Sequence, residues 1–212
     1  MDDSCCGKVV DVRALEARQR RVLVAVLGIN AATFLMMVGA GLYSGSSSLL
    51  SGALDNLGDA LTYGLSLAVV GATARAKAKV ALFKGLLILA AAVAVGAQIT
   101  WRATHPGVPI FETMGVAAVL NFAANLACLR LLTPYRTGDI NLASAWECSR
   151  NDLYEGGAVL LSTVGVWLFA AGWPDLVIAG ALLLMFLMSS LRVLRRSLAE
   201  LEQPQVKSDS NA

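Results

Sequence analysis

The sequence predicts an all-α membrane protein with six transmembrane helices and with both termini in the cytoplasm. Three observations predict this fold class. Of the 212 residues, 57% are hydrophobic and only 15% are charged, whereas a soluble domain usually carries about 25% charged residues. The hydrophobic residues gather in runs, and a helix needs roughly 20 of them to cross a bilayer. The basic residues gather between the runs on one side of the predicted membrane.

The six apolar runs are separated by polar residues, prolines or tight turns. The first run follows a basic pair, and it is too long for a signal peptide and lacks a convincing cleavage site. Pro106 and Pro109 precede the fourth run, Pro134 precedes the fifth, and Pro174 lies in the turn into the sixth. The runs are approximately Val22–Tyr43, Ser47–Ala72, Val80–Trp101, Ile110–Leu132, Leu142–Ala171 and Leu176–Val193.

These boundaries divide the chain into three parts. Residues 1–20 form a polar cytoplasmic segment, residues 21–198 form the transmembrane domain, and residues 199–212 form a short polar cytoplasmic tail. The excess of basic residues on one side is the positive-inside signature, which gives the orientation. Only Arg102 falls on the opposite side. The cytoplasmic segments collect Arg13, Arg18, Arg20, Arg21, Arg75, Lys77, Lys79, Arg136, Arg192, Arg195 and Arg196.

Two acidic residues, Asp55 and Asp59, interrupt the second apolar run. An ionised side chain within a bilayer is costly, so such acids are candidates for function. Their spacing stacks them one turn apart on one helix face, where like charges repel. A bound cation would compensate both carboxylates. The structural alternative is that one acid hydrogen bonds to a neighbouring helix and the other faces a water-filled vestibule.

The fifth run offers partner ligands in two pairs with the same four-residue spacing. Cys148 and Asp152 share one face, and Asn151 and Glu155 share another. If the first pair faces the two acids of the second run, the four residues supply three oxygen ligands and one sulfur ligand. This set suits tetrahedral Zn²⁺ or Cd²⁺ better than Mg²⁺ or Ca²⁺, which prefer oxygen alone. The spacing leaves open which pair faces the site.

The other cysteines and the single histidine carry weaker signals. Cys128 is expected to be a small buried apolar residue. The adjacent Cys5 and Cys6 either capture a soft metal on the cytosolic side or are two reduced thiols without a role. His105 is expected to be a solvated loop residue. Three asparagines are expected to hydrogen bond between helices, namely Asn30, Asn121 and Asn125.

Two stretches resemble the cation diffusion facilitators, a family of metal-ion/proton antiporters with six spans. Ser44–Asp59 resembles the family's second span, in which a small-residue turn precedes a His or Asp and an Asp follows four residues later. Cys148–Asp152 resembles its fifth span, and Gly172–Asp175 resembles the turn into the sixth. The similarity covers about residues 22–198.

The resemblance implies a tetrahedral transport site near the middle of the membrane. Asp55 and Asp59 would match the two ligands of the second span, and Asp152 the acid of the fifth. Cys148 falls where the family usually has His. Because thiolate is softer than imidazole, Zn²⁺ and Cd²⁺ are expected, with a lean toward Cd²⁺ or Hg²⁺. The implied activity is efflux of these ions from the cytosol in exchange for protons, and not an enzymatic reaction.

The resemblance also bears on partners and location. Family members commonly carry a cytoplasmic ferredoxin-like domain that dimerises, whereas only a short tail follows the sixth run here. A homodimer held mainly by membrane helices and the N-terminal segment is therefore expected, with the transported metal as substrate and no resident cofactor. The net charge of +2 gives no reason to expect a nucleic-acid partner. A prokaryotic inner (plasma) membrane is the expected location. The alternatives are another metal (Co²⁺, Ni²⁺, Fe²⁺ or Mn²⁺) or a transport-inactive membrane subunit that regulates a partner.

Overall fold

The structure, a computed structural model, describes residues 17–68, 74–136 and 140–202. Within these ranges the chain is helical and contains no strand, which confirms the all-α class. Each helix overlaps one of the six predicted runs, and α1, α3 and α6 extend beyond theirs into polar flanks. They are α1 (Ala17–Ser44), α2 (Ser47–Ala68), α3 (Ala74–Thr104), α4 (Phe111–Leu132), a short 3₁₀ turn (Thr133–Tyr135), α5 (Ile140–Phe169) and α6 (Trp173–Glu202).

The connection between α1 and α2 is short because its residues suit a tight reversal. Gly45 has a φ of 72°, in the left-handed region that glycine enters without steric cost. The backbone N–H of Ser46 donates to the carbonyl oxygen of Gly41 at 3.0 Å, which closes the end of α1. The Ser46 hydroxyl accepts a hydrogen bond from the N–H of Leu49 at 3.1 Å and so caps α2. The two helices therefore fold back on each other.

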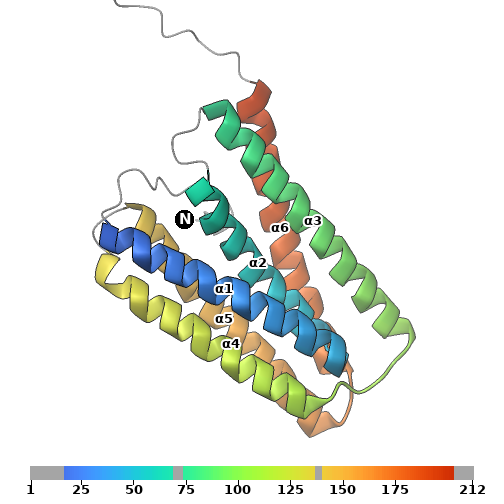
Figure 1. Cartoon of the computed structure of the whole chain (residues 1–212). Helices are drawn as coiled ribbons and strands as arrows, with labels where there is room; N and C mark the ends of the chain where they lie inside the picture. The colour runs from blue at the N-terminus through green and yellow to red at the C-terminus, as the bar shows by residue number, and fades with distance from the viewer. Residues whose placement is uncertain (1–16, 69–73, 137–139, 203–212) are drawn as a thin grey trace, which may run out of the picture.

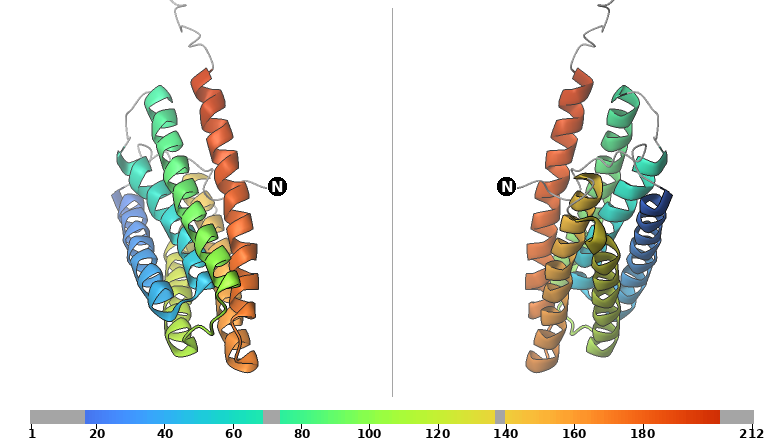
Figure 2. Two further views of the ribbon diagram at one scale, coloured as in Figure 1. Left: turned by 90° about the vertical axis from the view of Figure 1, so that its right-hand side faces the viewer. Right: turned by 90° about the vertical axis from the view of Figure 1, so that its left-hand side faces the viewer.

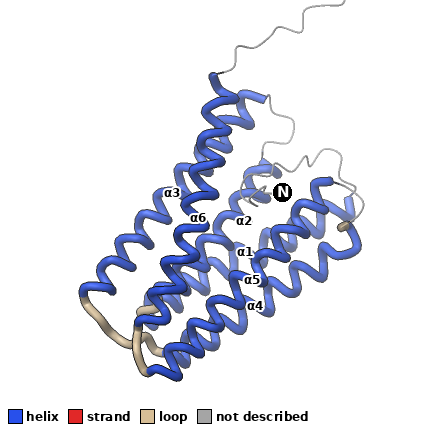
Figure 3. The backbone as a smooth tube through the Cα atoms, turned by 180° about the vertical axis from the view of Figure 1, so that it is seen from behind, coloured by secondary structure: helices blue, strands red, loops and turns tan. Residues whose placement is uncertain are grey.

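The helices form a group of four and a pair (Figure 1). In the group, α1 packs against α2 and α4, and α4 packs against α5. The pair consists of α3 and α6, which pack along each other and lie against α2. Helix α2 therefore occupies the centre, with contacts to both the group and the pair. The start of α1 and the end of α6 lie toward the same end of the bundle (Figure 2). The loops between α1 and α2, between α3 and α4, and between α5 and α6 gather at the opposite end (Figure 3).

Four helical segments are long and apolar enough to cross a membrane by length and composition. Helices α2 and α5 fall outside this set because acidic and other polar residues interrupt their apolar sequence. Since only the described residues enter this comparison, the count of six spans and the orientation of the termini stay predictions. The four segments are Arg18–Ser44, Leu82–Thr104, Phe111–Tyr135 and Trp173–Arg192.

The outer surface of the bundle is apolar. Large apolar side chains are exposed on α1, α3, α4, α5 and α6, for example Leu35 at 69%, Val116 at 64% and Leu161 at 70%. Among the described residues of α2, no large apolar side chain is exposed. Soluble monomers rarely expose apolar patches of more than a few hundred Å². The arrangement therefore suits a bundle whose exterior faces lipid and whose central helix is shielded from it.

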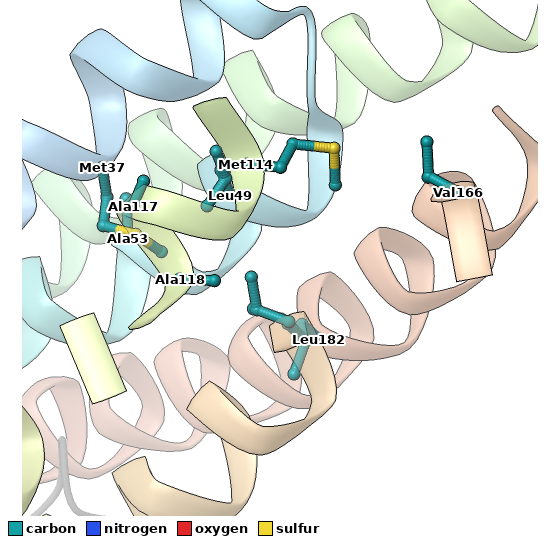
Figure 4. Close-up of a cluster of buried hydrophobic side chains, with 9 residues drawn as sticks. Met37, Leu49, Ala53, Met114, Ala117, Ala118, Val166 and Leu182 are labelled. Atoms are coloured by element: carbon teal, nitrogen blue, oxygen red, sulfur yellow. The ribbon is translucent and has the colours of Figure 1, made fainter. Parts of the chain in front are cut away.

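Two apolar clusters fill the four-helix group at different levels, and the first also includes Leu182 of α6. The first core cluster lies toward the loop-rich end, and Figure 4 shows most of its side chains. The second core cluster lies toward the end at which α1 begins. The first consists of Met37, Leu49, Ala53, Met114, Ala117, Ala118, Val159, Val166 and Leu182. The second consists of Leu23, Val26, Tyr63, Cys128, Leu132 and Ala145.

Between the two core clusters, each helix of the group contributes buried polar residues. We call this set the polar layer. Because an apolar cluster follows the layer in both directions along all four helices, the layer is enclosed along the bundle axis. Its members are Asn30 and Thr33 of α1, Asp55, Asn56 and Asp59 of α2, Asn121 and Asn125 of α4, and Cys148, Ser149 and Asp152 of α5.

Candidate metal centre

Helix α2 contributes the two acids of the polar layer. Asp55 is 9% exposed and Asp59 is 1% exposed, and their spacing places both on one face of the helix. Tyr63 lies one turn beyond Asp59 on the same face, and its hydroxyl donates a hydrogen bond to Asp59 Oδ2 at 3.3 Å. Two carboxyl groups are therefore buried side by side in the interior of an apolar bundle.

Helix α5 places the four candidate ligands in different surroundings. Cys148 and Asp152 are buried, with 3% and 2% of their surfaces exposed. Glu155 is half-buried, whereas Asn151 is exposed. The two pairs predicted from the sequence are thus separated by burial. Cys148 and Asp152 lie inside the bundle together, and Asn151 faces away from it.

The carboxyl groups of the two helices meet. A side-chain hydrogen bond joins Asp55 and Asp152, and Glu155 lies close enough to Asp55 to interact with it electrostatically. Asp59 interacts electrostatically with Asp55 as well. Two carboxyl groups at hydrogen-bonding distance can share a proton, and carboxylates gathered in this way also attract a cation. The contact between α2 and α5 therefore has the chemistry of a proton or metal site.

The ligand atoms are not gathered around one point in this conformation. Among the described residues, no group of three or more His, Cys, Asp or Glu side chains is arranged to hold a metal ion. A four-ligand shell would require rotation of side chains on α2 and α5.

A family model for the cation efflux transmembrane domain matches residues 23–201. This match spans all six helices and covers most of the 212 residues. The chain belongs to the cation efflux family. This is the cation diffusion facilitator family that the sequence motifs resemble. A comparison with curated proteins found no match.

Membership of the cation efflux family establishes the class of the protein. Members of this family transport metal cations across membranes and are not enzymes in general. The chain is accordingly a membrane protein of metal-cation transport, in agreement with its apolar helices. The residues that bind the metal stay a prediction, as do the metal itself and the exchanged proton.

Within this cation efflux protein, a hydrogen-bonded relay fixes the rotation of α2. The Thr33 hydroxyl of α1 donates to Asn56 Oδ1 at 3.1 Å. Asn56 Nδ2 donates in turn to Asn121 Oδ1 of α4 at 2.9 Å. Because Asn56 follows Asp55 directly, these bonds also fix the direction in which the acidic face of α2 points. The relay thus confirms that Asn121 bonds between helices.

The other two asparagines behave differently from each other. Asn125 Nδ2 of α4 donates to the backbone oxygen of Asp152 at 3.5 Å, which connects α4 to α5 next to a candidate ligand. Asn30 instead donates within its own helix, to the backbone oxygen of Val26 at 3.1 Å. The expected bond from Asn30 to another helix is therefore not among its described contacts, because the carbonyl four residues earlier is already within reach.

The role of Asp175 was not predicted from the sequence. This residue lies in the first turn of α6 and is 1% exposed. Its carboxylate accepts hydrogen bonds from the Ser46 hydroxyl at 2.7 Å, from the N–H of Ser47 at 2.6 Å and from the N–H of Ser48 at 3.0 Å. It therefore caps the start of α2 from another helix. The signal in the sequence was the stretch Gly172–Asp175, whose acid was assigned no partner.

The remaining cysteines and the histidine lie in the second core cluster, in a loop or outside the described residues. Cys128 is buried in the second core cluster, as predicted. His105 is exposed and stacks on Trp101 with 3.7 Å between the ring centroids, which agrees with a loop position. Cys5 and Cys6 lie outside the residues that the structure describes.

Proposed function

We propose that this protein exports divalent transition-metal ions, Zn²⁺ or Cd²⁺, from the cytosol in exchange for protons. One observation supports this proposal above all. Three carboxyl groups and a thiol from α2 and α5 lie in a polar layer between two apolar clusters. Ionisable residues enclosed in a membrane bundle are costly to keep unless they serve a substrate. The family supplies the substrate class, since its members move metal cations.

The proposed ligands are Asp55, Asp59, Cys148 and Asp152. They offer three oxygen donors and one sulfur donor, which suits the four-coordinate preference of Zn²⁺ and Cd²⁺. Glu155 lies beside the acids and is a second-rank ligand, whereas the exposure of Asn151 argues against it. Metal entry would pull the side chains of α2 and α5 toward one point.

The same groups provide the coupling to protons. A thiol or carboxyl group must lose its proton to bind a metal, so binding of metal and binding of protons exclude each other. If the centre opens alternately to the two sides of the membrane, each cycle would exchange a metal ion for protons. The direct contact between Asp55 and Asp152 supports this, because the pair can hold a proton when the metal has left.

The proposed orientation has six spans and both termini in the cytosol. Helix α2 has 22 residues, or about 33 Å at 1.5 Å per residue, which matches the hydrocarbon core of a bilayer. Exposed basic side chains at the end where α1 begins support a cytosolic position for that end, as the positive-inside rule requires. Those described include Arg18, Arg20, Arg21, Lys79, Arg136 and Arg195.

The test is metal flux in liposomes. Purified protein would be reconstituted with a metal-sensitive dye inside, and Zn²⁺ or Cd²⁺ would be added with and without an imposed proton gradient. We expect metal uptake that depends on the gradient and is absent from protein-free liposomes. If only Co²⁺, Ni²⁺, Fe²⁺ or Mn²⁺ is transported, the substrate is that ion and not Zn²⁺ or Cd²⁺. Folded protein that moves none of these ions would favour a regulatory subunit.

A Cys148→His substitution is expected to change the choice of metal. Imidazole is harder than thiolate, so the affinity for Cd²⁺ should fall by at least about tenfold relative to that for Zn²⁺. The ratio of the two dissociation constants, measured by dye competition in detergent, is the readout. Cys128→His serves as the control for a second buried thiol. An unchanged ratio in Cys148→His would remove Cys148 from the ligand set.

A further inference from the structure

Lys84 of α3 is a buried basic residue in the interior of the bundle. Its side chain is 6% exposed, and it is the one buried cation among the side chains that the structure describes. The Nζ atom donates a hydrogen bond to the Thr62 hydroxyl of α2 at 2.9 Å. Neither the sequence motifs nor the proposed transport cycle gives this charge a role.

From its position along α3, Lys84 would be expected to extend its side chain toward solvent. It lies two residues inside the apolar segment Leu82–Thr104, and a lysine near the end of a span usually extends its ammonium group to the interface. Lys79, five residues earlier, is exposed. Lys84 instead turns toward α2. A buried charge is costly unless an opposite charge compensates it, so its surroundings should contain an acid.

Asp59 is that acid. Thr62, which holds the ammonium group, lies three residues after Asp59 and therefore on an adjacent part of the same helix face. Asp59 has an electrostatic interaction with Lys84 in addition to its interaction with Asp55. The Thr62 hydroxyl is fixed in turn by a 2.6 Å hydrogen bond to the backbone oxygen of Gly58. The ammonium is thus held in place beside the acidic face of α2.

We propose that Lys84 is a built-in counter-cation of the metal centre, which partly neutralises Asp59 and thereby lowers the affinity of the centre for divalent ions. This inference rests on the proposed function. Three carboxylates and a thiolate carry more negative charge than one divalent ion neutralises, and such a site would retain its ion. A fixed positive charge nearby weakens binding without contacting the metal. Lys84 is accordingly a positioning residue and not a ligand.

The position of Lys84 in the fold gives this charge a further consequence. It belongs to the α3–α6 pair, whereas the candidate ligands belong to the four-helix group. The Lys84–Thr62 bond therefore crosses from one unit to the other. Any displacement of the pair against the group would carry the ammonium toward or away from Asp59. The affinity of the centre would change with the conformation of the bundle.

The experiment measures the dissociation constant of Cd²⁺ by dye competition for detergent-solubilised protein. Lys84→Gln removes the charge but keeps a donor for Thr62, and Lys84→Met removes both. Lys84→Arg keeps the charge. Lys79→Gln is the matched control, since it neutralises an exposed lysine on the same helix. All variants would be checked for a native unfolding midpoint and for monodispersity.

We expect Lys84→Gln and Lys84→Met to bind Cd²⁺ at least tenfold more tightly than the native protein. Lys84→Arg should stay within about threefold of native, because it preserves the charge, and Lys79→Gln should not change. Flux at saturating Cd²⁺ should fall in the neutral variants, since the ion leaves more slowly. A purely structural lysine would give weaker binding instead.

Unchanged or weaker binding in a folded neutral variant would overturn the role of Lys84 while leaving the metal centre intact. An equal gain in Lys79→Gln would also overturn it, because the effect would then be one of overall charge. Native protein that binds neither Cd²⁺ nor Zn²⁺ would overturn both the centre and this inference. The two failures are therefore distinguishable.

Discussion

Asp59→Asn is expected to reduce proton-driven metal flux to the background of protein-free liposomes. Asp59 is 1% exposed, lies between Asp55 and Tyr63 on one helix face, and interacts with Lys84. The substitution keeps the size of the side chain and its ability to accept from Tyr63, but removes the negative charge. The affinity for Cd²⁺ should fall by at least about 100-fold, or about 2.8 kcal/mol at 1.4 kcal/mol per tenfold.

Two variants control this result. Glu147→Gln neutralises an exposed acid next to Cys148 on α5 and should leave flux close to native. Asp55→Asn should also lose flux if both acids of α2 bind the ion. Flux that survives in Asp59→Asn but is lost in Asp55→Asn would shift the centre toward Asp55, Asp152 and Glu155. Flux that survives in both would contradict a metal centre on α2.

The helices could be predicted from the sequence because the signal is local. Long apolar runs and the residues that break them define where each helix begins and ends to within a few residues at most boundaries. The acids of α2 were also found locally, since their cost in a membrane is evident without knowledge of the neighbours. The same acids explain why α2 and α5 are less apolar than the other four helices. The polar residues that interrupt these two helices are those proposed to bind the substrate.

The choice between the two faces of α5 could not be made from the sequence. Cys148 with Asp152, and Asn151 with Glu155, have the same spacing, and each pair forms a consistent face. Only the packing of α5 against α2 and α4 shows that Cys148 and Asp152 are buried and Asn151 is exposed. Glu155 nevertheless lies close to Asp55, so one residue of the second pair also lies near the site, which the helical spacing alone does not predict.

The roles of Lys84 and Asp175 depend on contacts between residues far apart in the sequence. Lys84 lies at the start of an apolar run, where a lysine is usually an interfacial residue. Asp175 follows Trp173 and Pro174 in a turn, where an acid commonly caps its own helix. The partners of Lys84 and Asp175 lie 22 and 127–129 residues away. No spacing within either segment contains that information.

Asp175→Ala is expected to lower the stability of the bundle more than any other single change outside the metal centre. The carboxylate accepts one hydrogen bond from the Ser46 hydroxyl and two from the backbone N–H groups of Ser47 and Ser48. Those N–H groups belong to the first turn of α2, where no helical carbonyl can accept them. All three serines are buried, so water does not replace the acid. The loss should be about 3 kcal/mol, since hydrogen bonds to a charged group are each worth about 1.5–3 kcal/mol and partial relaxation offsets some of the cost.

The unfolding midpoint in detergent, with heat or a denaturing surfactant, is the measurement for this prediction. Glu112→Ala is the matched control, because Glu112 is also an acid in the first turn of its helix, α4, but is exposed. The loss of stability in Glu112→Ala therefore measures the general effect of removing a negative charge from the start of a helix. Asp175→Asn should fall between native and Asp175→Ala, because one side-chain oxygen can still accept. A midpoint for Asp175→Ala equal to that of Glu112→Ala would mean that α2 holds its position without the cap. In that case the relay through Thr33, Asn56 and Asn121 would be sufficient to fix the acidic face of α2.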